Sequence, residues 1–90
     1  MPLAYRQAVG ELLDEWALYE RGLRRLPPTA EYLRGQIISF GMPVKDWTLK
    51  SLDRYLDRCL AEGRKPQSEK LLNALLSDVP LPRTQWQRHR

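Results

Sequence analysis

The fold of this chain is decided mainly by residues 5–26, YRQAVGELLDEWALYERGLRRL. The large apolar residues of this stretch follow one another at alternating steps of four and three, which is the spacing of one face of an α-helix. They are Tyr5, Val9, Leu12, Trp16, Tyr19, Leu23 and Leu26. Burial of one tryptophan or tyrosine ring stabilises a protein by roughly 2–3 kcal/mol. The pattern predicts a helix about six turns long, ended by Pro27 and Pro28, whose apolar face is covered by the rest of the chain or by a second copy.

Three further helical segments follow, separated by glycine and proline. Thr29 is a suitable N-cap for a helix over residues 30–40. Residues 44–62 contain neither glycine nor proline, so they form either one helix or a short turn and then a helix capped by Thr48. A last helix is expected over roughly residues 67–78.

The sequence therefore predicts the all-α class: a compact four-helix domain at residues 1–79, followed by a basic, flexible tail at residues 80–90. Gly41 and Gly63 are expected to end the second and third helices. The side chains expected on the inner faces of the last three helices are Leu33, Ile37, Phe40, Leu49, Leu52, Leu56, Cys59, Leu60, Leu71, Leu72, Leu75 and Leu76.

The composition argues against several classes of function. The chain has one cysteine, Cys59, and one histidine, His89, which leaves too few ligands for a cysteine–histidine metal site and no basis for a disulfide framework. The paired carboxylates, Asp14 with Glu15 and Asp53 with Asp57, each lie among bases on an expected solvent face, and there is no glycine-rich phosphate loop. We therefore expect no catalytic residue, no metal, no cofactor and no small-molecule substrate. No stretch has the length and hydropathy of an export signal or a membrane span. We therefore expect a cytoplasmic protein that is not an enzyme and acts by binding.

The positive charge of the chain is concentrated at its C-terminal end. The formal net charge is +4, from fifteen basic and eleven acidic residues. Three of the bases lie in the last ten residues, which contain no acid, so residues 1–80 hold twelve bases and eleven acids. A basic arm on a nearly neutral body predicts electrostatic attraction that is local rather than spread over the domain.

The second half of the chain carries a recognisable pattern. It consists of GMPVKDW at residues 41–47, LDRYLDR at residues 52–58 and EGRKPQSEKLLNAL at residues 62–75. Over residues 33–76 this pattern resembles the helix-turn-helix domains of phage repressors and Cro proteins. The resemblance implies a recognition helix that enters the major groove, in a transcriptional regulator of bacterial or phage type that pairs as a homodimer on symmetric sites. The alternative is an ordinary helical hairpin joined by a Gly-Pro turn.

Basic residues of the second half are the candidates for contact with DNA. Lys50, Arg54 and Arg58 recur at steps of four and share one helical face. Such a face contacts phosphates or guanine edges, or else is a solvated face whose bases pair with Asp53 and Asp57. The complete set of candidate DNA contacts is Lys50, Arg54, Arg58, Arg64, Lys65, Arg83, Trp86, Arg88 and Arg90.

A second class of function remains open, in which the protein binds another protein. In this alternative it is an inhibitor or adaptor, encoded by a phage or mobile element, that occludes a larger host protein complex. Its partner-binding residues would be Tyr5, Trp16, Tyr19 and Tyr32, because tryptophan and tyrosine are enriched at interface centres. More often such side chains simply form a core, and a structural subunit of a helical assembly would use the same aromatic face.

Overall fold

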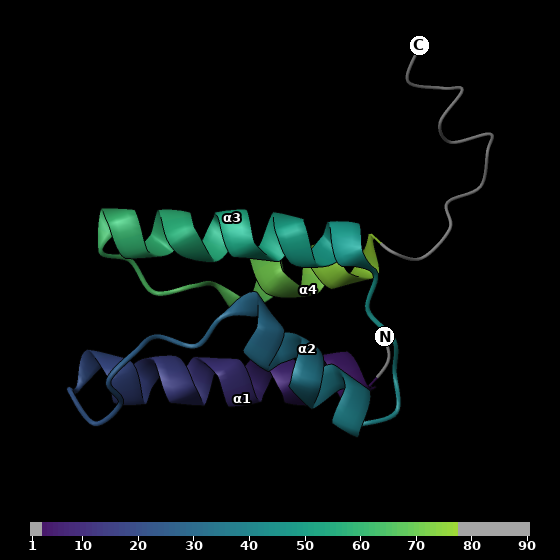
Figure 1. The fold of residues 1–90 in the computed structure, drawn as a ribbon, viewed down its shortest axis with the longest axis horizontal. Helices are drawn as coiled ribbons and strands as arrows, with labels where there is room; N and C mark the ends of the chain where they lie inside the picture. The colour runs from purple at the N-terminus through teal and green to yellow at the C-terminus, as the bar shows by residue number, and fades with distance from the viewer. Residues whose placement is uncertain (1–2, 78–90) are drawn as a thin grey trace, which may run out of the picture.

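The computed structural model describes residues 3–77 and consists there of helices and their connections (Figure 1). The helices are α1 (Leu3–Glu20), α2 (Ala30–Ser39), α3 (Asp46–Glu62) and α4 (Ser68–Leu76). The expected all-α domain of four helices is thus confirmed. None of the helices in this part of the chain is both long and apolar enough to cross a membrane. The tail expected at residues 80–90 lies outside the described residues.

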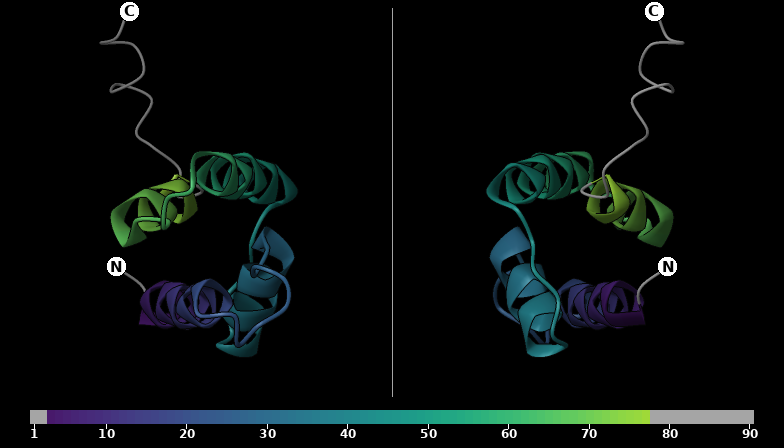
Figure 2. Two further views of the ribbon diagram at one scale, coloured as in Figure 1. Left: turned by 90° about the vertical axis from the view of Figure 1, so that its left-hand side faces the viewer. Right: turned by 90° about the vertical axis from the view of Figure 1, so that its right-hand side faces the viewer.

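The four helices form a ring when the bundle is viewed end-on (Figure 2). α1 packs against α2 and α4, and α3 packs against the same two helices from the other side. The two long helices, α1 and α3, therefore lie diagonally across the ring and run in the same direction (Figure 1). This arrangement brings the C-terminal ends of α1 and α3 to one end of the bundle, where both long helices stop.

The core fills the centre of this ring with side chains from all four helices. Its members, each at most 8% exposed, are Tyr5, Ala8, Val9, Leu12, Trp16, Ala30, Leu33, Ile37, Leu49, Leu52, Leu56, Cys59, Leu71 and Leu75. The inner faces predicted from the sequence are confirmed in most positions. Phe40 and Leu60 are corrections, because they are 41% and 37% exposed. Phe40 follows the last residue of α2, where the helical periodicity no longer governs which way a side chain points.

The C-terminal end of α1 differs from the prediction. The helix stops at Glu20 rather than at Pro27, because Gly22 adopts a left-handed conformation with φ of 76°. The N–H of Leu23 donates to the carbonyl of Leu18 at 2.9 Å, and the N–H of Gly22 donates to that of Tyr19 at 3.0 Å. These two bonds form a Schellman motif, which glycine favours because it lacks a Cβ. The predicted six-turn helix through Leu26 is therefore wrong.

The apolar face of α1 is covered by the chain itself. Tyr5 and Trp16 are 5% and 2% exposed beneath the neighbouring helices. This face is consequently not available as the seam of a homodimer, although its length had favoured that use. The hydroxyl of Tyr5 also donates to the carbonyl of Pro43 at 3.4 Å and so connects α1 to the segment between α2 and α3.

The start of α2 confirms a prediction, and the start of α3 decides between two alternatives. Thr29 caps α2 as predicted, since its Oγ1 accepts a hydrogen bond from the N–H of Tyr32 at 3.3 Å. α3 is a single helix that begins at Asp46, so Thr48 lies buried in its first turn rather than capping it. α3 and α4 are joined through Tyr55, whose hydroxyl accepts a hydrogen bond from the N–H of Gln67 at 2.9 Å.

Candidate nucleic-acid interface

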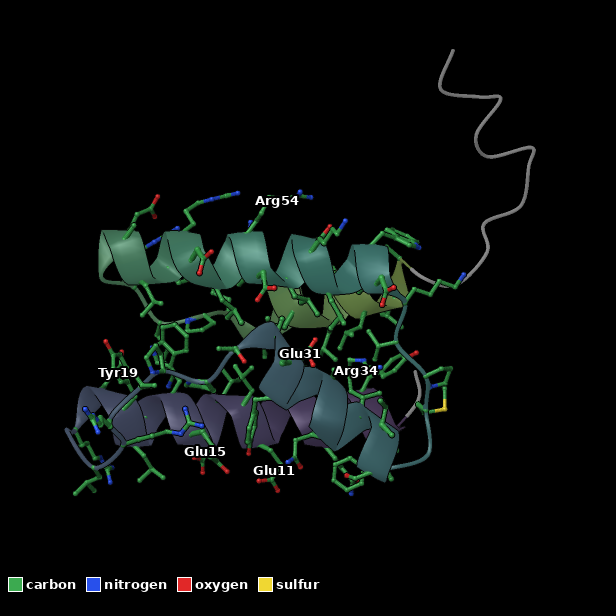
Figure 3. The ribbon with its side chains drawn as sticks, in the orientation of Figure 1. Glu11, Glu15, Tyr19, Glu31, Arg34 and Arg54 are labelled. Carbon is green, nitrogen blue, oxygen red and sulfur yellow. The ribbon has the colours of Figure 1, made fainter. Side chains whose placement is uncertain are left out.

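The outward face of α3 carries the basic residues that the sequence singled out. Leu52 and Leu56 point into the core, being at most 3% exposed, so the opposite side of the helix faces solvent. Lys50, Arg54 and Arg58 lie on that opposite side, and Figure 3 shows Arg54 directed away from α1 and α2. Successive bases are one helical turn apart, so the three charges extend over about 12 Å along the helix axis.

These three cations are not engaged by acidic neighbours in the described part of the chain. The ion pairs found in residues 3–77 join Arg24 to Glu15, Arg34 to Glu31 and Arg64 to Glu62. Arg54 donates a long hydrogen bond of 3.4 Å from Nη2 to the hydroxyl of Ser51, which leaves its other guanidinium donors facing outward. The cations of α3 therefore face solvent and are available to bind an anion from outside the protein.

A tryptophan lies on the same face. Trp47 is 53% exposed, although it is a large aromatic residue, and it was not among the predicted contacts. It precedes Lys50 by three residues and Arg54 by seven, which places it on their side of the helix. That spacing was visible in the sequence and could have identified it. We call Trp47, Lys50, Arg54 and Arg58 together the α3 ridge.

Acidic side chains flank the ridge and reduce the positive electrostatic potential around it. Asp53 and Asp57 are exposed on α3, and the whole helix carries three basic and four acidic residues. The positive potential of the ridge is thus narrow, and a bound polyanion would have to approach along the line of the three cations. Contacts from this helix would be few and well defined.

The remaining candidate DNA contacts are distributed differently. Arg64 and Lys65 lie in the connection after α3, at the end of the helix rather than on its outward face. Arg64 is paired with Glu62, with Nη2 2.7 Å from Oε1. The residues of the proposed basic arm lie outside the described part of the chain: Arg83, Trp86, Arg88 and Arg90.

The helix-turn-helix resemblance covers residues 33–76, and within them α3 is a single helix from Asp46 to Glu62 with no turn inside it. The connections in this range are residues 40–45 between α2 and α3 and residues 63–67 between α3 and α4. The DNA-binding motif usually has a turn of three or four residues. The chain matches no family model, no curated protein and no solved structure. The function of this chain is therefore inferred from the chemistry of its surface rather than from similar proteins.

The four aromatic residues considered for a protein partner are all at least half-buried. Tyr5 and Trp16 belong to the core, whereas Tyr19 and Tyr32 are half-buried. The rings of Trp16 and Tyr19 meet edge to face, with centroids 6.1 Å apart. Partial burial, and then the carboxylates of Glu15 and Glu11, raise the pKa of the Tyr32 hydroxyl. Half-buried tyrosines at the margin of the core can contribute to an interface but do not form one alone.

The described residues offer little for metal or nucleophilic chemistry. Within residues 3–77, no three histidine, cysteine, aspartate or glutamate side chains are placed to hold a metal ion. Cys59 is buried in the core at 1% exposure. Burial, and to a lesser extent a hydrogen bond with Cys59, raise the pKa of the Tyr55 hydroxyl. Cys59 is thus a small apolar residue of the core.

Proposed function

We propose that this protein is a small, non-enzymatic DNA-binding regulator that lays the α3 ridge against a duplex. The observation that carries the proposal is the placement of Lys50, Arg54 and Arg58 on one solvent-facing line, one turn apart, with no acid of the described residues bound to them. Lysine and arginine in this arrangement contact successive phosphates, and arginine also reads the O6 and N7 atoms of guanine in the major groove. Trp47 adds an apolar surface at one end of the ridge.

The size of the ridge limits what a single copy can achieve. Each phosphate contact contributes a slope of about −0.9 to the dependence of log K on log salt, so three contacts give about −2.7. This attraction supports weak, non-specific binding. A regulator that recognises a particular site would add the contacts of Arg83, Arg88 and Arg90, or bind as a pair to two half-sites about one helical turn apart.

The first experiment measures binding of a fluorescently labelled duplex by anisotropy at about 50 and 200 mM salt. We expect binding at the lower salt concentration and a steep loss at the higher one. The control for the removal of a ridge cation is Arg6→Ala. This change removes an exposed cation from α1, which lies diagonally across the ring from α3. Its affinity should equal that of the wild type. Absence of binding at low salt would remove the proposal.

The flanking acids provide a second test with the opposite sign. Asp53→Asn and Asp57→Asn remove negative charge beside the ridge without changing the shape of the side chains. Because a carboxylate repels phosphate, both changes should increase DNA affinity severalfold at low salt. Asp14→Asn on α1 is the control, and it should leave affinity unchanged. A decrease in DNA affinity on removing Asp53 or Asp57 would contradict the proposal that the duplex lies along this face.

The competing proposal is an inhibitor or adaptor that occludes a host protein complex. It is favoured by the near balance of charge over residues 1–80 and by the acids beside the ridge. If this proposal is correct, a pull-down with the protein from host lysate should return one stoichiometric protein and no nucleic acid. Mass measurement by light scattering tests homodimer formation under either proposal.

A further inference from the structure

The end of the bundle where α1 and α3 stop carries an unusual apolar loop. Residues 21–29 leave α1 there and lead to α2 (Figure 1). Leu23 and Leu26 in this loop are 71% and 69% exposed, the highest values of any large apolar side chain in residues 3–77. Exposed leucines this close together are a departure from ordinary soluble surfaces, because apolar area in water is costly.

The loop that presents these leucines is held in place. Arg24 pairs through Nε with Oε1 of Glu15 at 3.0 Å, and its Nη1 donates to the carbonyl of Leu26 at 2.6 Å. The guanidinium also lies over the ring of Tyr32, 5.6 Å from its centroid. A single side chain thus connects the loop to both α1 and α2. The two leucines are displayed by a fixed backbone, which reduces the entropy lost when they bind a partner.

A cleft opens at the same end of the bundle, between the last turns of α1 and α3. Its volume is about 210 Å³, and Trp16, Tyr19, Leu60 and Arg64 are among the residues that line it. An apolar cavity of about 150 Å³ accommodates a benzene molecule. This cleft is therefore large enough for one large apolar side chain of a partner, inserted against the edge-to-face pair of Trp16 and Tyr19.

The charges around this end are predominantly positive. Arg21 and Arg25 flank the leucines, and Lys65 follows the end of α3; all three are exposed. None of the three is in an ion pair with another residue of the described chain. The carboxylate of Glu20 is the negative charge nearest to Arg21 and Arg25 in sequence. The carboxylate of Glu62 is paired with Arg64. A complementary surface is apolar at its centre and acidic around it.

We propose that this end of the bundle binds an acidic amphipathic helix of a partner protein. One apolar side chain of that helix enters the cleft, Leu23 and Leu26 pack against its apolar face, and its carboxylates meet Arg21, Arg25 and Lys65. We call this set of features the basic–leucine end. The proposal goes beyond DNA binding and does not depend on it, because it uses none of the residues of the α3 ridge.

Two other occupants fit the basic–leucine end less well. A bilayer needs more apolar surface than two leucines provide, since even a single myristoyl chain gives only marginal membrane binding. A second copy of the chain, placed symmetrically on this end, would bring Arg21 and Arg25 of both copies together, and such like charges repel. An acidic helix satisfies both the leucines and the cations.

The test uses a synthetic amphipathic helix of about 18 residues, with leucine at helical spacing and glutamate elsewhere. Binding to the full-length protein is measured by titration calorimetry, alongside the same peptide with lysine in place of glutamate. We expect the acidic peptide to bind and the basic peptide not to bind. Leu23→Ser with Leu26→Ser should weaken binding at least tenfold. Leu3→Ser, which changes a leucine 66% exposed at the other end of α1, should have no effect.

A charge exchange makes the test independent of folding defects. The double change Arg21→Glu and Arg25→Glu should abolish binding of the acidic peptide and create binding of the basic one. Arg54→Ala should leave peptide affinity unchanged, which separates this site from the DNA-binding proposal. Three results would overturn the inference: equal binding of both peptides, binding of vesicles of equal phosphatidylcholine and phosphatidylserine but of neither peptide, or a homodimer dissociated by the leucine changes.

Discussion

α1 and α3 are the two long helices of the ring, and they use their tryptophans in opposite ways. Trp16 is 2% exposed within the core, whereas Trp47 is 53% exposed on the α3 ridge. Apolar residues surround Trp16 at steps of three and four, and cations follow Trp47 at the same steps. The neighbours at helical spacing, rather than the residue itself, decide whether a ring supports the fold or faces solvent.

The largest expected effect is a difference in stability between the two tryptophans. Trp16→Ala should lower the free energy of unfolding by about 3–5 kcal/mol, because it leaves a large cavity in the core. Trp47→Ala should change it by less than about 0.5 kcal/mol, as an exposed substitution does. Urea denaturation followed by circular dichroism measures both values. Similar losses for the two variants would show that Trp47 is part of the core.

The ends of α1 and α3 should behave alike, since both stop at a left-handed glycine. Gly22→Ala and Gly63→Ala should each destabilise the protein by about 1–2 kcal/mol, the energy of placing an alanine in that conformation. A Cβ at either position would meet no atom of residues 3–77 within 4 Å beyond its chain neighbours, so the effect comes from the backbone. Gly10→Ala, inside α1, should instead stabilise by up to about 1 kcal/mol. Thermal unfolding of the three variants tests whether the two helices end in the same way.

A smaller difference is expected between two arginines. Arg24→Ala removes the ion pair with Glu15 and the contact with Tyr32, and should cost about 0.5–1 kcal/mol. Arg54→Ala on the α3 ridge should have almost no effect on stability but should weaken DNA binding. The two variants are compared by urea denaturation and by anisotropy. If Arg54 proved to be the more stabilising of the two, the ridge would have a structural role.

Much of the fold followed from the sequence because its periodicity was unambiguous. The alternation of threes and fours from Tyr5 to Trp16 predicted the core face of α1, and Gly41 and Gly63 predicted the ends of α2 and α3. The predicted helix continued beyond Gly22 because the apolar spacing continues through Leu23 and Leu26. Periodicity alone could not show that a single glycine ends the helix and turns these two leucines outward.

The candidate sites were only partly visible in the sequence. The stripe of Lys50, Arg54 and Arg58 could be read from its spacing, but its freedom from ion pairs with Asp53 and Asp57 depends on side-chain conformations. The basic–leucine end could not be predicted, because it requires the C-terminal ends of α1 and α3 to lie at the same end of the bundle. Their common position is a consequence of how the two helices are oriented in the ring.

The most direct test of the account removes the cations of the α3 ridge and measures the salt dependence of DNA binding. The variant carries Lys50→Ala, Arg54→Ala and Arg58→Ala, and its folding is checked by circular dichroism. If these residues contact phosphates, the slope of log K against log salt should decrease in magnitude by about 2.7 relative to the wild type. An unchanged slope would contradict the claim that α3 binds the polyanion.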